Sequence, residues 1–263
     1  FNHQAVPARD DFDALEIAGK FIRIANHLLK PTKQGRHTLN LAGLKIGHAT
    51  DEKYHTGCTV VLCPPNTVAS VDVRGPAPGR REAMLLQPDT PIQFIQAVML
   101  TGGSAFGLAT ADGAMRYLAE QGIGHPTPIR PIPLVPTAVV YDLFMNNGQK
   151  PPDAEMGYQA CQNATDIGVP QGNVGAGAGV TVGKWGGFQT IMKGGFGLSS
   201  VSLDELVVGA AAVVNAVGDV VNKDGSVLAG AREANGRWLV EKEVNRYVFE
   251  IKNQKKQKNT SSV

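Results

Sequence analysis

Two kinds of hydrophobic spacing follow each other along this chain. Near the N-terminus, apolar residues recur every three or four positions across residues 12–29, which predicts an amphipathic helix. We expect its apolar face to pack on the body of the same protein, because its polar face lacks the strongly basic character of a membrane-surface helix. From residue 41 the pattern changes to short apolar runs, which predict strands at residues 59–62, 68–73 and 95–100.

A second helix is expected where the third of these runs ends. Ser104 follows Thr101-Gly102-Gly103, and its hydroxyl can cap a helix by accepting backbone N–H bonds. Small residues then recur at helical spacing until Gly122, so this helix is expected to lie close on a sheet. The residues of this stripe are Gly107, Ala111, Ala114 and Leu118.

The second half of the chain alternates short apolar segments with turn residues. Prolines exclude a regular helix from residues 125–136, and residues 138–141 predict an apolar strand that ends at Asp142. A weaker helical pattern covers residues 153–163. Further on, the apolar run 206–215 predicts a fully buried element, and the pair Asp224-Gly225 predicts a hairpin turn.

The composition is that of a folded protein without a dominant charge. The 263 residues are 43% hydrophobic and 18% charged, with a net charge of +2, and they suffice for one large domain or two small ones. We therefore expect no nucleic-acid partner, and we interpret the basic residues 252–258 as a solvated linker. Because no apolar run reaches the length of a membrane-spanning helix, no membrane partner is expected either.

The cysteines and histidines add little chemistry. Three cysteines in a chain of this length do not form a disulfide scaffold, which favours a reducing, cytoplasmic location. The sequence begins at Phe1 and not at Met, which leaves a removed signal peptide open. The histidines show no metal-ligand spacing, so no metal site is expected and lone histidines such as His48 are interpreted as structural.

The glycine-rich run 172–184 does not fit a nucleotide-binding loop. A Walker loop requires glycine where Ala178 stands and Ser or Thr where Trp185 stands, and a dinucleotide fingerprint requires glycine in place of Val180. A nucleophile elbow around Ser104 fails as well, because Phe106 occupies the position of its last glycine. We expect no cofactor; a nucleotide-dependent enzyme that uses this loop remains an alternative.

Three polar residues stand alone in apolar or glycine-lined segments: Tyr141, Lys184 and Asn215. A buried polar group costs free energy unless it is paired, so such residues either lock a core or line a site. Both interpretations remain open for each of them. A fourth feature is the dipeptide Asn259-Thr260 in the polar tail.

The order of several motifs resembles the DmpA-type aminopeptidase family. They occupy residues 43–51, 57–62, 71–75, 100–108, 141–143, 172–184 and 214–220. The resemblance implies an α/β fold, a four-layer αββα sandwich of the autoprocessing N-terminal-nucleophile type. It also implies an N-terminal extension at residues 1–40, a large-subunit region at 41–259, and the start of a small subunit at 260–263.

The resemblance further implies a hydrolase that cuts itself once and then cleaves amide bonds of peptides or amino-acid oligomers. Asn259-Thr260 looks like the junction and Thr260 like the freed nucleophile, with Ser261 and Ser262 as backups. Lys184 would orient the hydroxyl or handle its proton, and Asn215 would donate a hydrogen bond to the oxyanion. Tyr141 would assist the oxyanion or hold substrate. Glycine-containing loops would let backbone approach the substrate at Gly102, Gly103, Ser104, Gly175 and Gly177.

The partners implied by the family are a small subunit from the same precursor, further copies of the protein, and a small peptide or amide-oligomer substrate. The sequence ends three residues after Thr260, at Val263. It is therefore either part of a longer precursor, or Asn259-Thr260 is an ordinary polar tail and the junction lies elsewhere. A non-catalytic family member that acts as a binding module is the alternative to the hydrolase.

Overall fold

The computed structural model describes residues 43–75, 77–87, 89–90, 94–145 and 147–240. Several sequence-based predictions lie outside these residues. They are the N-terminal helix at 12–29, the basic stretch at 252–258, the junction Asn259-Thr260, and the backup nucleophiles Ser261 and Ser262.

A five-stranded sheet forms the centre of the described structure, with strand order β1-β2-β4-β5-β3. Strands β1, β2 and β4 pair antiparallel, β5 runs parallel to β4, and β3 pairs antiparallel with β5. The expected strands at 59–62, 95–100 and 138–141 are confirmed with shifted ends. The bounds are β1 Lys45–Asp51, β2 Thr56–Leu62, β3 Arg80–Arg81, β4 Ala97–Thr101 and β5 Thr137–Val139.

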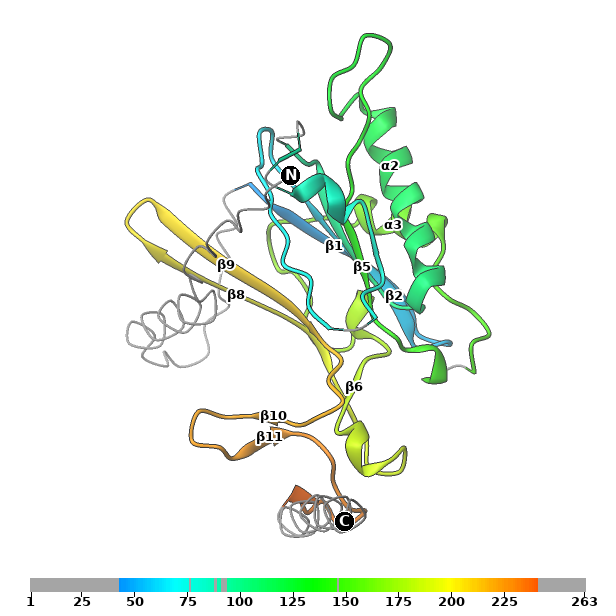
Figure 1. Cartoon of the computed structure of the whole chain (residues 1–263), viewed down its shortest axis with the longest axis vertical. Helices are drawn as coiled ribbons and strands as arrows, with labels where there is room; N and C mark the ends of the chain where they lie inside the picture. Colours follow the sequence, from blue (N-terminus) through cyan, green and yellow to red (C-terminus); the bar gives the residue numbers. More distant parts are fainter. Residues whose placement is uncertain (1–42, 76, 88, 91–93, 146, 241–263) are drawn as a thin grey trace, which may run out of the picture.

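Two helices, α2 (Thr110–Glu120) and α3 (Ala154–Gln162), cover one face of this sheet (Figure 1). Asp153 caps α3 as an N-cap residue should, because its carboxylate accepts a hydrogen bond from the Met156 N–H at 3.0 Å. The predicted small-residue stripe of α2 is buried, and the main core lies between it and the sheet. This core consists of Ala49, Cys58, Val60, Ala97, Met99, Ala111, Ala114, Leu118, Val135, Ala160 and Cys161.

The start of the first helix differs from the prediction. Residues Ser104–Ala109 form a 3₁₀ helix (η2), and the α-helix begins only at Thr110. Ser104 makes no capping hydrogen bond, because Gly103 occupies the cap position and Ser104 itself lies in the left-handed region with φ 54°. The expected cap at Ser104 is therefore wrong, whereas Gly122 does follow the helix end, with φ 69°.

The opposite face of the sheet packs against a long hairpin, β8 (Gly195–Leu203) and β9 (Leu206–Val214), as Figure 1 shows. A second core, formed by Ile46, Val169, Phe196 and Leu198, joins the hairpin to the sheet. Helices, five-stranded sheet and hairpin thus form three successive layers. The α/β prediction is confirmed, and the order α, β, β is that of an αββα sandwich.

Two predicted elements do not appear as expected. Strand β9 was expected to be fully buried, but Leu206 is 56% exposed, because among the described residues β9 pairs only with β8 and its far end lies beyond the second core. Residues 68–73 form no strand. Their valines are exposed, and within the described chain their backbone pairs with no strand of the sheet, so the strand predicted from this short apolar run is wrong.

Two short hairpins complete the described strands. Strand β6 (Thr181–Val182) pairs with β7 (Met192–Lys193), and β10 (Val220–Val221) pairs with β11 (Val227–Ala229). The turn predicted at Asp224-Gly225 is confirmed between β10 and β11. The remaining 3₁₀ helices are η1 Ala83–Leu86, η3 Leu143–Met145, η4 Gly175–Gly177 and η5 Lys184–Gly186.

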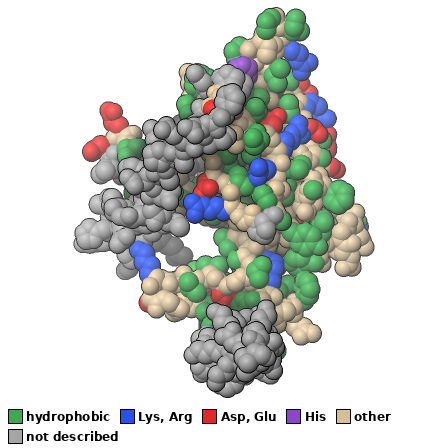
Figure 2. Space-filling view, in the orientation of Figure 1, with side chains coloured by type: hydrophobic (Ala, Val, Ile, Leu, Met, Phe, Trp, Pro, Cys, Tyr) green, Lys and Arg blue, Asp and Glu red, His purple; other side chains and the backbone are tan. Residues whose placement is uncertain are grey.

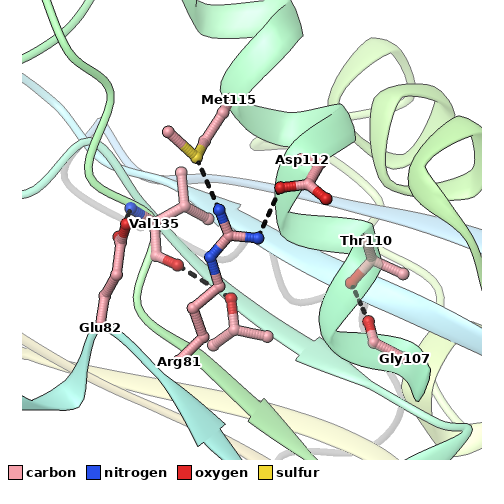
Figure 3. A network of polar contacts seen from close by, with 8 residues as sticks. Arg81, Glu82, Gly107, Thr110, Asp112, Met115 and Val135 are labelled. Atoms are coloured by element: carbon pink, nitrogen blue, oxygen red, sulfur yellow. Dashed lines mark hydrogen bonds and ion pairs between the residues drawn. The ribbon is translucent and has the colours of Figure 1, made fainter. Parts of the chain in front are cut away.

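Polar contacts tie the edge strand β3 to helix α2 (Figure 3). The Arg81 guanidinium donates to the Asp112 carboxylate at 2.6 Å and to the Met115 sulfur at 3.2 Å. The neighbouring Glu82 carboxylate accepts a hydrogen bond from the Val135 N–H at 2.9 Å. These contacts hold the segment before β5 in place, and β5 leads directly to Tyr141.

Charges are mixed over the surface that Figure 2 presents. Lys and Arg side chains are scattered among Asp and Glu, and along the helices the two signs lie side by side. This distribution agrees with the net charge of +2. Among the described residues, no helix combines the length and the apolar character needed to cross a membrane.

Candidate active site

A cavity of about 260 Å³ contains all three isolated polar residues that the sequence singled out. Tyr141 follows β5, Lys184 begins η5, and Asn215 follows β9, so three segments far apart in the sequence meet here. The lining residues are Tyr141, Phe144, Lys184, Gly187, Phe188, Asn215 and Val217.

Both the oxygen and the nitrogen of the Asn215 side-chain amide form hydrogen bonds. Its Oδ1 accepts hydrogen bonds from Lys184 Nζ at 2.8 Å and from the Thr181 N–H at 3.2 Å, and its Nδ2 donates to the Tyr141 carbonyl at 3.1 Å. Since the oxygen faces two donors and the nitrogen faces an acceptor, the orientation of the amide is determined. The second Nδ2 hydrogen has no partner among the described residues, so it can bind an oxygen in the cavity.

Lys184 is half-buried behind Asn215. Besides Asn215, its ammonium donates to the carbonyls of Thr181 at 2.6 Å and Ala216 at 3.1 Å. Three acceptors match the three N–H bonds of an ammonium group. Burial lowers the pKa of Lys184 below its ordinary value. The residue therefore carries its charge within a fixed cage of oxygens and can lose its proton more easily than a surface lysine.

Aromatic rings form the other side of the cavity. The Tyr141 and Phe144 ring centroids are 6.1 Å apart, and those of Phe144 and Phe188 are 5.6 Å apart. Sequence reasoning missed Phe188. The available signal was an aromatic side chain directly after Gly186-Gly187, a glycine pair close to Lys184.

The five residues expected to bring backbone close to substrate do not line this cavity. A Cβ at Gly102 would overlap the Asp142 carboxylate, one at Gly175 would overlap Thr59, and one at Gly177 would overlap the backbone of Phe196. Internal packing thus accounts for these glycines without a substrate. Gly103 and Ser104 lie in the same turn, where the Gly103 N–H donates to Asp142 and the Ser104 N–H donates to Val140.

Asp142 is a fully buried carboxylate that sequence reasoning treated only as the end of a strand. The Thr56 hydroxyl donates to its Oδ2 at 2.7 Å, and the Gly103 N–H donates to its Oδ1 at 2.6 Å. Burial raises the pKa of Asp142, while both hydrogen bonds oppose the rise. Because Asp142 follows Tyr141 directly, this anchor fixes the backbone whose carbonyl holds Asn215.

His48 has a structural role, as expected for a lone histidine. Its Nε2 donates to the Pro170 carbonyl at 3.1 Å, so in the neutral ring Nδ1 accepts from the Thr59 hydroxyl at 2.9 Å. Thr59 in turn accepts from the Ala176 N–H at 3.0 Å, which fastens η4 to the sheet. Burial lowers the pKa of His48, so the neutral form that this chain of bonds requires is favoured.

Solved structures confirm the fold. A Burkholderia sp. beta-aminopeptidase matches with a TM-score of 0.56 and 20% identity over 74% of this chain and 56% of its own. The L-aminopeptidase D-Ala-esterase/amidase of Ochrobactrum anthropi matches with a TM-score of 0.53 and 17% identity over 68% of this chain and 53% of its own. The latter is described as a new variant of the Ntn hydrolase fold, and the chain shares this fold.

Relatives found by sequence share a higher identity with this chain than these solved structures do. An uncharacterized aminopeptidase of Mycobacterium leprae is 42% identical over 200 residues, covering 70% of this chain and 53% of the relative. A 6-aminohexanoate-oligomer endohydrolase of Paenarthrobacter ureafaciens is 32% identical over 202 residues, covering 76% of this chain and 54% of the relative. The chain thus spans about half the length of the curated relatives it matches. Peptidase family S58 matches residues 39–256, and the chain belongs to this family.

Proposed function

We propose that this chain is part of a self-cleaving hydrolase that cuts amide bonds of peptides or amino-acid oligomers. The observation that carries the proposal is the cluster of Tyr141, Lys184 and Asn215 at one cavity in a member of peptidase family S58. The names of the relatives, aminopeptidase and 6-aminohexanoate-oligomer endohydrolase, both describe amide hydrolysis. We further propose that the rest of the protein completes the site as a small subunit, and that processed copies associate.

In this mechanism the oxyanion of the tetrahedral intermediate binds the second Nδ2 hydrogen of Asn215. The Lys184 ammonium, 2.8 Å from Asn215 Oδ1, draws electron density toward the amide oxygen and so strengthens Nδ2 as a donor. Removal of one oxyanion donor typically raises the barrier by about 3 kcal/mol. Asn215→Ala should therefore lower kcat by two to three orders of magnitude, roughly 10²–10³-fold.

The nucleophile in this proposal is Thr260, freed when the Asn259-Thr260 bond is cut. Its hydroxyl adds to the substrate carbonyl while its own α-amine, with an ordinary pKa of about 8, accepts the proton. The leaving amine takes that proton as the carbon–nitrogen bond breaks, and water then hydrolyses the acyl-enzyme ester. Before self-cleavage the Thr260 nitrogen is an amide, so another base must act, and the lowered pKa of Lys184 suits it to that step.

Intact mass spectrometry of the protein expressed from its complete gene tests the proposal. The wild type should give two fragments, the smaller beginning at Thr260, and the matched control Ser261→Ala should give the same two. Thr260→Ala should give one uncut chain without hydrolysis of aminoacyl p-nitroanilides. Cleavage at this bond in Thr260→Ala, or a wild type that is neither cut nor active, would count against the proposed function.

A further inference from the structure

Rings and one aliphatic side chain line the cavity together with Lys184 and Asn215. They belong to Tyr141, Phe144, Phe188 and Val217. Phe144 lies between the other two rings, with centroid distances of 6.1 Å to Tyr141 and 5.6 Å to Phe188. We call these four residues the aromatic wall. It begins at the residue whose carbonyl holds the Asn215 amide, so a group on the wall lies next to the proposed oxyanion donor.

Much of this wall is exposed in the described structure. Phe188 is 73% exposed and Val217 is 66% exposed, although each lies beside a cavity and not on a flat surface. Covering exposed apolar surface with an apolar group removes it from water, which lowers the free energy. At about 260 Å³ the cavity has the volume of roughly eight or nine water molecules, at about 30 Å³ each, which accommodates an amino-acid side chain.

The charges around the cavity also favour an apolar group. Among the described residues that line it, Lys184 is the one with a charge, and the three N–H bonds of its ammonium already have oxygen acceptors. An acidic side chain would therefore lose its hydration without gaining a free donor from Lys184. A basic side chain would meet no carboxylate among the described lining residues and would approach the like charge of Lys184.

We infer that the aromatic wall is a specificity subsite for an apolar side chain on the substrate residue whose carbonyl is attacked. The inference rests on the proposed function and narrows it to a substrate class. Amides of bulky apolar residues, such as leucyl compounds, bind this subsite in preference to glycyl, aspartyl or lysyl compounds. Phe188 determines this preference most strongly, because it is the most exposed of the four residues, at 73%.

The test compares kcat/KM for glycyl, leucyl, aspartyl and lysyl p-nitroanilides with the processed enzyme from the complete gene. The wild type should prefer the leucyl over the glycyl compound by about tenfold or more, and Phe188→Ala should reduce this ratio by about tenfold. Phe188→Leu, which keeps an apolar side chain, should restore part of it. Phe106→Ala is the matched control, since Phe106 is 68% exposed but does not line the cavity, and it should leave the ratio unchanged.

The outcomes separate the inference from the function on which it rests. A wild type that is processed and active, but whose leucyl-to-glycyl ratio does not change in Phe188→Ala, overturns the inference and leaves the function standing. A wild type that prefers the aspartyl or lysyl compound also overturns the inference and leaves the proposed function standing. If Phe188→Ala blocks processing while Phe106→Ala does not, the wall packs against other protein and the inference is overturned. A wild type with neither processing nor hydrolysis overturns both.

Discussion

The buried carboxylate of Asp142 provides a quantitative test of how the site is held. Asp142→Ala removes the acceptor for the Thr56 hydroxyl and for the Gly103 N–H, which donate at 2.7 and 2.6 Å. A buried donor left without a partner costs about 1–3 kcal/mol, so two of them cost about 2–6 kcal/mol. Relief from burying the carboxylate charge offsets part of this cost. We expect the free energy of unfolding at pH 7 to fall by about 1–4 kcal/mol once this offset is included.

The isosteric change Asp142→Asn is the matched control. Its amide oxygen can still accept from the Gly103 N–H, and the Thr56 hydroxyl can turn to accept from the new NH₂ group. We therefore expect a smaller loss than in Asp142→Ala. Urea unfolding of the complete protein, followed by circular dichroism, measures both variants. A loss below about 0.5 kcal/mol in Asp142→Ala, the range of ordinary surface substitutions, would refute the reasoning.

The same carboxyl predicts how stability depends on pH. Because burial raises the pKa of Asp142 above its ordinary value of 3.8, the folded state binds this proton more tightly than the unfolded state. The contribution of Asp142 to the free energy of unfolding therefore falls as pH rises from 3.8 through the raised pKa, and is constant above it. Asp142→Asn should lose this contribution, so its stability should fall less across that interval when unfolding is repeated at several pH values.

Two further predictions concern the helices and Lys184. In Gly113→Ala the new Cβ would overlap the Ala154 carbonyl oxygen, so α2 and α3 must separate and thermal or urea unfolding should show a loss of about 1–3 kcal/mol. Gly218→Ala, whose Cβ meets no atom within 4 Å, should be near neutral, and equal losses in the two variants would contradict the packing argument. Because burial lowers the pKa of Lys184, the positive charge beside Asn215 Oδ1 is lost as pH rises through a value below 10.5. The alkaline limb of the wild-type kcat/KM profile should therefore lie below pH 10.5, and a profile without a limb below that value would contradict this role of Lys184.

Local signals in the sequence predicted the elements whose causes are local. Residues 153–163 became a helix because Asp153 caps it and Gly157 lets it lie close to its neighbour, and both features are visible in the sequence. Strand β9 was predicted to be buried because it is apolar, but burial depends on what packs against a strand, and in the described part of the chain β9 pairs only with β8. The strand predicted at residues 68–73 is absent for the same reason, since a strand requires a pairing partner that a short apolar run does not reveal.

The sequence likewise predicted some residues of the candidate site and missed others. Tyr141, Lys184 and Asn215 stood out because polar residues are unusual in apolar segments, and the cavity brings them together. Thr260 was placed by resemblance to a family and lies outside the described residues, so its role remains a proposal. Phe188 and Asp142 escaped notice for a physical reason. An aromatic side chain usually indicates core packing, and an aspartate after a strand usually indicates a turn, so only the folded structure reveals their contacts.

The long sequence separation of the three polar residues affects when any chemistry at this cavity can begin. Asn215 is bonded to Lys184 across 31 residues and to Tyr141 across 74. A chain emerging from the ribosome therefore has no assembled cluster until the segment after β9 has been synthesised and has docked on the end of β5. If this cluster cuts the protein's own backbone, self-cleavage requires the completed tertiary structure. An unfolded chain is therefore not cleaved prematurely.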